Sequence, residues 1–396
     1  MLFRSKTPIL VDVSNKMKAY EDCPHLNMVI DTKAKMFSNG IWKLYDKNDN
    51  EVKEHDVLKL LYKPNPLQNN SKSWLMLYSL SYDIFSNQFI RKLKAFKKDE
   101  LPKVLYILPS QFMTVEPTGK IYSQTKISDI IKGYQLCYTG NVAMSGYSEK
   151  FEVDDIIYIA QNRNPIIGVS KIGSLTLPIS NIVATLKSRN IVITEKGIFG
   201  ILSNDSSDVD AVPIADGERN QIRRTFKSDN DLYNEESKIV LTNAKLKWQP
   251  ISFPMKDMMY FEEIEDDVAA ICGEFGMDRD IFPSTKGATF ENKLQGLKST
   301  YQNTIIPMAD ELAETLTNEF ALNEKGLKLK LCYDHLPIMK EDELKEAQAE
   351  LTETQRLSLL KRDGIISAET YAQEAEIEMT GTGISEPKST FNVSQN

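Results

Sequence analysis

The sequence predicts an α+β fold in which sheets and helices occupy separate stretches of the chain. Residues 89–159 consist of short runs of β-branched and aromatic residues between turns, which is typical of strands. Beyond Gly168 the apolar residues recur at helical spacing, which is typical of amphipathic helices. A chain of 396 residues is long enough for about two or three domains.

The composition indicates a soluble protein of a reducing compartment. The chain has 56 acidic and 48 basic residues and a net charge of −8, which argues against a protein that coats nucleic acid. The net charge does not argue against a protein past which nucleic acid slides without binding tightly. Four cysteines, Cys23, Cys137, Cys272 and Cys332, lie too far apart for a zinc pattern or a disulfide framework. The amino-terminal stretch lacks the features of a signal peptide.

The first part of the chain is expected to begin with strands. Residues 27–37 and 41–46 alternate in polarity, like two strands joined by the turn Phe-Ser-Asn-Gly. The connector 61–73 contains two prolines and predicts a loop that ends in Ser71 or Ser73 as a helix N-cap. The following stretch, 73–90, is the most apolar, but its Asp83 and amides predict a buried helix and no membrane span.

Long helices follow the β-rich stretch. An apolar stripe predicts a helix over 172–197, whose 26 residues would span roughly 39 Å. Pro178 either kinks this helix or marks its first turn. Further helices are expected from about Met255 to Gly276, from Phe290 to Phe320 with a kink at Pro307, and from Asp342 to Arg362. A strand is expected at 328–333, and residues from Thr380 onward are expected to be disordered.

Catalytic motifs are absent from the sequence. The three histidines, His25, His55 and His335, are far apart, and neither a nucleophile elbow nor a phosphate-binding loop of an NTPase occurs. No cofactor and no metal are therefore expected. The acidic run 262–267 leaves one alternative open, a Mg²⁺-dependent nucleic-acid-processing enzyme. Its carboxylates spread around the predicted helix, which favours a solvated helix face instead.

Four segments, in order, resemble the portal proteins of tailed bacteriophages. "LLYKPNPLQN" is similar to the family's segment before its first helix, and "FEVDDIIYIAQNRNPIIGVSKIGSL" to the strand and turn that open a long helix. "IEDDVAAICGEFGMDRDIFPSTKGATFENKL" is similar to the family's helix, turn and small-residue loop, and "TIIPMADELAETL" to its next helix. Two positions depart from the family: Lys171 stands where a proline is usual, and residues 86–89 replace a Gly-Asn-Ala-Tyr run.

This resemblance implies a ring-forming portal fold with a β-rich wing, long stem helices, a small α/β clip and a helical crown. The segments implied are the wing (1–170), first stem helix (171–197), clip (198–253), second stem helix (254–278), channel loop (279–289), wing helix and strand (290–338), crown (339–379) and tail (380–396). Family members form a ring, usually of twelve subunits, at one capsid vertex, and pass double-stranded DNA during packaging and ejection. They are not enzymes; a separate terminase supplies the ATP chemistry. The implied partners are terminase, the head–tail adaptor and the major capsid protein, in the virion and, during assembly, in the host cytoplasm.

Three groups of residues are expected to carry this function. The loop residues Ser284, Thr285, Lys286 and Gly287 would face the DNA, with Phe282 and Phe290 anchoring the two ends of the loop in the wing. A basic stripe in the implied clip would bind an acidic partner: Arg219, Arg223, Arg224 and Lys227. An aliphatic stripe on the first stem helix would form the ring interface: Ile179, Ile182, Val183 and Leu186.

Overall fold

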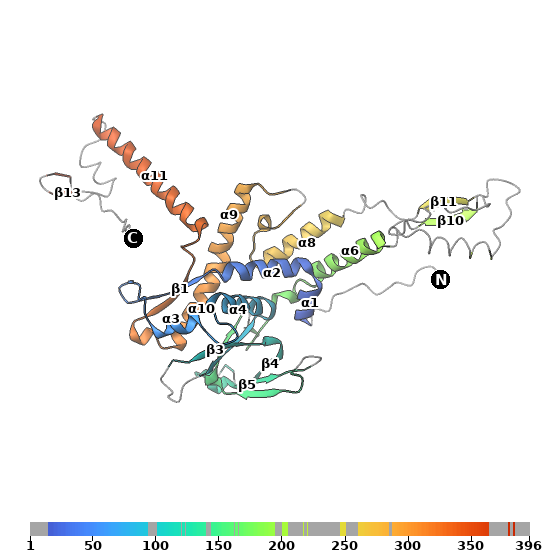
Figure 1. Cartoon of the computed structure of the whole chain (residues 1–396), viewed down its shortest axis with the longest axis horizontal. Coiled ribbons are helices and arrows are strands. Elements are labelled where there is room, and N and C mark those ends of the chain that lie inside the picture. Colours follow the sequence, from blue (N-terminus) through green and yellow to red (C-terminus); the bar gives the residue numbers. More distant parts are fainter. Residues whose placement is uncertain are drawn as a thin grey trace. The chain divides into compact units, whose positions relative to one another are not determined.

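Two packed helices form the centre of the larger part of the chain. In the computed structural model α2 (Pro24–Phe37) lies along α4 (Ser71–Phe85), and the short α1 (Lys16–Asp22) precedes them (Figure 1). The structure describes residues 15–93, 101–119, 121–122, 124–139, 144–161, 163–164, 166–194, 200–204, 217, 220, 246–250, 260–284, 287–363, 379–380 and 383–384. The chain divides into two units, Met1–Leu331 and Cys332–Asn396.

The prediction of a strand at residues 27–37 is wrong, because this stretch belongs to α2. Pro24 occupies the first turn, where its missing N–H is not needed. The buried residues of α2 recur at helical spacing: Leu26, Val29, Ile30, Lys33, Ala34, Met36 and Phe37. Alternation and helical spacing coincide over such a short run, and burial against α4 decides in favour of the helix.

Helix α4 is the buried helix that the sequence predicts. Asn70 caps it, rather than Ser71 or Ser73, since the Asn70 side chain accepts a hydrogen bond of 2.7 Å from the Ser73 N–H. Three aromatic side chains stack along its buried face: Trp74, Tyr78 and Tyr82, with ring centroids 6.0 and 5.7 Å apart. No helix in the described part of the chain is long and apolar enough to cross a membrane.

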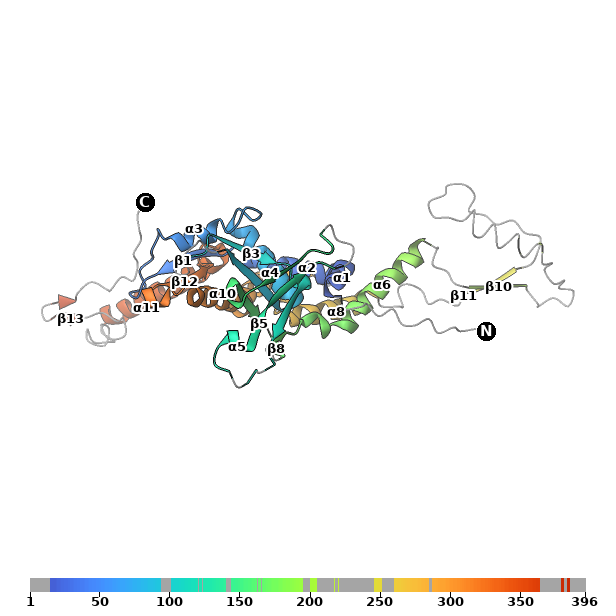
Figure 2. The same cartoon turned by 90° about the horizontal axis from the view of Figure 1, so that it is seen from below.

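Two three-stranded antiparallel sheets follow α4, as the β-rich pattern predicts (Figure 2). One sheet has the order β3-β2-β7, from Val104–Leu108, Asn87–Leu93 and Ile156–Ala160. The other has the order β4-β5-β6, from Met113–Pro117, Ile131–Cys137 and Ser148–Phe151. Side chains of both sheets share one core: Phe89, Leu108, Met113, Ile131, Tyr134, Leu136, Phe151 and Ile156. Burial of these aliphatic and aromatic groups fixes the register of the strands.

Shorter elements complete the first unit. Strand β1 (Ile41–Tyr45) pairs with the late strand β12 (Lys328–Cys332), so both predicted strands are confirmed. The remaining elements are α3 (Asp56–Tyr62), α5 (Ile127–Ile130), the pairs β8–β9 (Arg163–Asn164, Ile167–Gly168) and β10–β11 (Gly200–Asn204, Leu246–Pro250), and 3₁₀ turns at Ser110–Phe112, Val153–Asp155, Lys171–Gly173, Arg279–Ile281 and Asn323–Lys325.

The long helices predicted beyond Gly168 are present. Helix α6 (Thr176–Thr194) packs against α8 (Tyr260–Glu274), and Pro178 lies in the first turn of α6, where it does not break a hydrogen bond (Figure 1). Helix α9 (Phe290–Thr300) continues through a π-helical turn (Tyr301–Ile305) into α10 (Ile306–Glu319). The π-turn ends at Ile305, and Pro307 lies in the first turn of α10, so the long predicted helix is interrupted just before this proline. The kink at Pro307 stays a prediction.

The second unit contains one long helix, α11 (Pro337–Arg362), which begins five residues before the predicted Asp342. Beyond it, β13 (Met379–Thr380) pairs with β14 (Gly383–Ile384). The first residues of the tail that was expected to be disordered therefore form a short ladder.

Candidate functional site

The segment that leaves α8 is closed by a Schellman motif. Gly276 has a φ of 67°, its N–H bonds the Gly273 carbonyl at 3.2 Å, and the Met277 N–H bonds the Cys272 carbonyl at 2.8 Å. The Thr304 hydroxyl donates to the Gly276 carbonyl at 2.6 Å, from the π-turn opposite. A side chain at Gly276 would meet that hydroxyl at 2.4 Å. The positive φ and the lack of room for a side chain therefore both require glycine immediately after α8.

Asp278, two residues after Gly276, is hydrogen-bonded to α9 and packs against it. Asp278 caps the turn Arg279–Ile281 by accepting from the Asp280 N–H, and its own N–H donates to the Thr300 hydroxyl at 3.2 Å. Gly296 lies against Asp278, since a Cβ there would be 2.9 Å from the Asp278 Cγ. The start of the candidate channel loop is therefore held on a helix at defined positions.

Arg279 and Phe282 fix the backbone as the loop begins. The Arg279 guanidinium donates to the carbonyls of Phe282 and Pro283 at 3.3 and 3.1 Å. Phe282 is 3% exposed, which is the burial expected of an anchor, and its attachment to the wing stays a prediction. Thr285 and Lys286 lie outside the described residues. The residues that flank them are joined by a hydrogen bond of 3.3 Å from the Gly287 N–H to the Ser284 carbonyl.

The far end of the loop differs from expectation. Thr289 caps α9 by accepting from the Asn292 N–H at 3.2 Å. Phe290, however, is 82% exposed, so the prediction that it anchors the loop in the wing is wrong. It occupies the first helical position, where the helix cap and not side-chain burial fixes the chain. The loop is therefore anchored by Phe282 at one end and by the Thr289 cap at the other.

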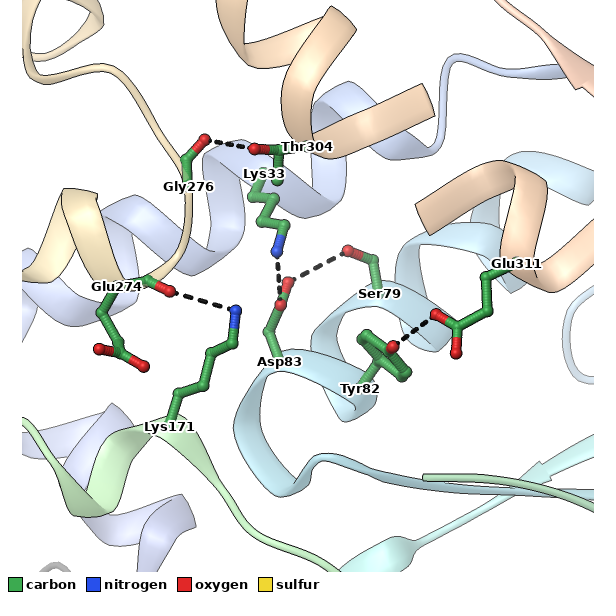
Figure 3. A network of polar contacts seen from close by, with 9 residues as sticks. All are labelled: Lys33, Ser79, Tyr82, Asp83, Lys171, Glu274, Gly276, Thr304 and Glu311. Carbon is green, nitrogen blue, oxygen red and sulfur yellow. Dashed lines mark hydrogen bonds and ion pairs between the residues drawn. The ribbon is translucent and has the colours of Figure 1, made fainter. Parts of the chain in front are cut away.

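A buried ion pair between Lys33 and Asp83 lies close to Phe275, the residue that follows α8. The Lys33 ammonium of α2 lies 2.7 Å from the Asp83 carboxylate of α4, and their side chains are 4% and 1% exposed (Figure 3). Ser79 donates to the same carboxylate at 3.5 Å, and the ammonium lies 5.9 Å from the centre of the Phe275 ring. Two charges withdrawn from water are stable only as a pair, so this contact ties α2 to α4.

Lys171 adds a second ammonium close to this pair. It comes from the turn that precedes α6 and donates to the Glu274 carbonyl at 3.2 Å, at the carboxyl end of α8 (Figure 3). A cation at a helix carboxyl end is favoured by the helix dipole. Burial, and then the charge of Lys33, lowers the pKa of Lys171. The lysine that replaces the family's usual proline therefore braces the beginning of α6 against the end of α8.

An open cavity of about 390 Å³ lies over the two lysines. Tyr82 and Glu311 also line this cavity, and the Tyr82 hydroxyl donates to the Glu311 carboxylate of α10 at 2.7 Å. Burial, and then this hydrogen bond, raises the pKa of Tyr82. No sequence motif predicts this network, and the available signal is Asp83, a carboxylate near the end of a mostly buried helix.

The aliphatic stripe predicted for the ring interface lies on α6, which packs against α8, and it is mostly buried within a single chain. Ile179 and Ile182 have no exposed surface, Val183 is 5% exposed, and Leu186 is partly buried. Asn181 also reaches across to Asp267 at 3.4 Å. Three of the four residues are therefore covered before any second subunit arrives, and their role at a ring interface stays a prediction.

The structure does not test the basic stripe and does not support a metal site at the acidic run. The basic stripe Arg219, Arg223, Arg224 and Lys227 lies outside the described residues. The acidic run 262–267 lies at the beginning of α8. Among the residues that the structure describes, no group of three or more His, Cys, Asp or Glu side chains could hold a metal ion.

The fold resembles that of chains in solved gene transfer agent and phage portal structures. The chain is similar to a chain of the neck of a native gene transfer agent particle, computed with C12 symmetry, with a TM-score of 0.58, 15% identity and coverage of 94% of this chain and 96% of that chain. It is similar as well to an HK97-family phage portal protein from Corynebacterium diphtheriae, with a TM-score of 0.53, 7% identity and coverage of 84% and 99%.

The family follows from the sequence match. A family model described as phage portal protein matches residues 24–359, and the chain therefore belongs to the phage portal protein family. Two uncharacterised rickettsial proteins are also similar. One, from Rickettsia bellii strain RML369-C, is 21% identical over 71% of this chain and 69% of its own length. The other, from Rickettsia felis, is 22% identical over 77% and 76%. These matches confirm the predicted family and give no support to the Mg²⁺-dependent enzyme.

Proposed function

We propose that this protein is the subunit of a ring at one vertex of a phage or prophage capsid, through which double-stranded DNA is packaged and ejected. The observation that carries the proposal is the family match over residues 24–359, which includes both long helices and the loop between α8 and α9. Similar chains occur in gene transfer agent necks computed with C12 and C6 symmetry, which supports a cyclic assembly, usually of twelve subunits in this family.

The loop 279–289 is the proposed DNA contact. Its two ends are held by the Schellman motif and Arg279 on one side and by the Thr289 cap on the other, while its small polar residues allow several copies to approach one axis. One lysine per subunit, Lys286, gives a sparse ring of positive charge. Such phosphate contacts are salt-sensitive and read no sequence, as a conduit for any DNA requires.

The acidic balance of the chain fits the same task. A net charge of −8 per subunit disfavours tight binding of phosphates, so DNA moves through the ring instead of coating it. The ring supplies no chemistry of its own in this proposal. A separate terminase drives packaging from outside.

Docking partners are assigned to the clip, residues 198–253. The stripe Arg219, Arg223, Arg224 and Lys227 presents cations at helical spacing, which suits an acidic surface on terminase or on the head–tail adaptor. The major capsid protein surrounds the ring in the virion, and assembly takes place in the host cytoplasm.

Imaging of the purified protein tests the proposal. We expect negative-stain images to show rings with a central hole, and we expect purified rings to leave DNA intact in the presence of Mg²⁺. Compact monomers with metal-dependent nuclease activity would overturn the proposal in favour of the enzyme.

The loop assignment has its own test, the charge reversal Lys286→Glu. Rings should form normally, while the length of packaged DNA or its retention should change, because a repulsive ring of carboxylates replaces the ammonium groups. The matched control is Lys132→Glu, which reverses an exposed lysine on β5 and should leave packaging unchanged. Normal packaging by the Lys286→Glu ring would remove the DNA-contact role.

A further inference from the structure

The open cavity over the buried ion pair is lined by polar groups from several elements. Lys33 comes from α2, Tyr82 from α4, Lys171 from the turn before α6, and Asn303 and Thr304 from the π-helical turn. Lys33 and Tyr82 are each 3% exposed, so the core holds these two groups in place. Polar groups that converge on one cavity are typical of a small-molecule site, and π-helical turns are frequent at functional sites.

The second ammonium group at this cavity has no ion-pair partner. Within the part of the chain that the structure describes, Lys171 forms no ion pair, and its hydrogen bond goes to the uncharged carbonyl of Glu274. Figure 3 shows the Glu274 side chain directed away from this contact and the Asp83 carboxylate already bonded to Lys33. Burial and the charge of Lys33 lower the pKa of Lys171 more than Asp83 and Glu274 raise it. An anion in the cavity would therefore stabilise the charged form of Lys171.

A neutral group at the same cavity also lacks a partner. The Gln161 side chain lines the cavity, its Oε1 atom is buried, and no group among the described residues donates a hydrogen bond to that atom. Buried acceptors in proteins are nearly always paired with a donor. A water molecule would supply the donor but no charge for Lys171. A small anion that also carries an O–H supplies both.

We propose that this cavity binds free inorganic phosphate. At neutral pH this ion has charged oxygens, which accept from the Lys171 ammonium, and an O–H, which donates to Gln161 Oε1. The volume of about 390 Å³ leaves room for the ion and several waters, since one water occupies about 30 Å³. Sulfate has no O–H, and a phosphate monoester, with a second pKa of about 6, has mostly lost its O–H above neutral pH. The cavity therefore favours the free phosphate ion over these two anions.

Bound phosphate would join segments that meet at the end of α8. Lys171 donates to the last residue of α8, and Thr304 donates to the Gly276 carbonyl just beyond it. An ion held between these segments binds the folded chain only, so it also raises the stability of the chain. The inference goes beyond the proposed ring and concerns each chain by itself.

Isothermal titration calorimetry of the purified chain with sodium phosphate tests the site, slightly above neutral pH and at an ionic strength kept constant with chloride. Lys171→Gln should weaken phosphate binding at least about tenfold, because a hydrogen bond to a charged group is lost. Glu311→Gln should tighten it at least about twofold, because it removes a negative charge from the cavity lining. The matched control is Lys132→Gln, which alters an exposed lysine on β5 and should leave phosphate binding unchanged. Sulfate and glycerol 3-phosphate should each bind at least about threefold more weakly than phosphate, because neither supplies the donor for Gln161.

Opposite effects of the two cavity variants support the site, because general damage to the fold does not tighten binding. Absence of saturable binding to wild type overturns the inference. Binding that Lys171→Gln leaves unchanged overturns it as well, since phosphate is then an adventitious ion only. Equal affinity for either reference anion overturns the assignment of free phosphate.

A second measurement decides if Lys171→Gln does not fold. Acetic anhydride acetylates accessible amino groups, and mass spectrometry follows each lysine of wild type separately. At a phosphate concentration of about twice Kd, labelling of Lys171 should slow about threefold, and labelling of Lys132 should not change. Equal rates at Lys171 with and without phosphate overturn the inference. None of these outcomes bears on ring formation, so the proposed function stands or falls by its own test.

Discussion

Asp83→Asn should destabilise the first unit by about 3 to 5 kcal/mol, the usual cost of breaking a buried pair on one side. The Lys33 and Asp83 charges lie 2.7 Å apart and are 4% and 1% exposed, so neither reaches water. At an effective dielectric constant of about 20 their attraction is about 6 kcal/mol. Asparagine keeps the shape but loses this attraction, and the Phe275 ring at 5.9 Å compensates only about 1 kcal/mol of it.

The double variant Lys33→Met/Asp83→Leu separates the loss of the pair from the loss of one charge. It should lie within about 2 kcal/mol of wild type, because removing both charges also removes the cost of burying them. The surface control is Asp56→Asn, whose partner is Lys59 at exposures of 79% and 76%, and it should cost less than about 1 kcal/mol.

Urea unfolding followed by tryptophan fluorescence measures these differences, since Trp42 and Trp74 are buried in the same unit. All variants are compared at one low protein concentration, so that assembly does not add to their stability. If Asp83→Asn and Asp56→Asn lower the free energy of unfolding equally, the reasoning is refuted, because burial would then not determine how much an ion pair contributes to stability.

Three further predictions concern α6, α8 and the glycine that follows α8. Gly276→Ala should lower the melting temperature through its positive φ and its contact with Thr304, whereas Gly273→Ala, with no atom within 4 Å, should not. Ile182→Asp should give unfolded or aggregated chains, because Ile182 is covered within one chain; folded monomers on size-exclusion chromatography would instead place it at the ring interface. Burial raises the pKa of the Cys272 thiol to about 11 from 9.0 in a free chain, so the unfolded state loses this proton first and stability should fall from pH 9 to 11. Urea unfolding should show a shallower fall in Cys272→Ala, and an unchanged pH dependence in that variant would contradict this assignment.

Sequence patterns predicted most elements where spacing is long or distinctive. Between Phe89 and Ala160, runs of β-branched and aromatic residues alternate with turn residues several times. The helices α6 and α10 show sustained apolar stripes. The short run 27–37 was assigned wrongly because alternation and helical spacing overlap in so few residues, and packing against α4 decides the outcome. Phe290 was assigned wrongly because periodicity gives a side chain's face but not whether a neighbour covers that face.

The polar network around the buried ion pair could not be predicted, because its residues come from distant parts of the sequence. Lys33, Asp83, Lys171 and Glu311 meet only when α2, α4, the beginning of α6 and α10 are packed together. The same limit applies to the stem stripe. Its apolar spacing predicts burial correctly, but spacing alone does not say whether the covering helix belongs to the same chain.

The position of the loop 279–289 in the assembled ring tests the central claim most directly. Cryo-electron microscopy of the purified ring should place this loop, from every subunit, at the narrowest part of an axial channel wide enough for double-stranded DNA. Phe282 should stay buried at its base, as it is in the single chain. A ring in which the loop lies on the outer surface, or a particle without an axial channel, would contradict the account.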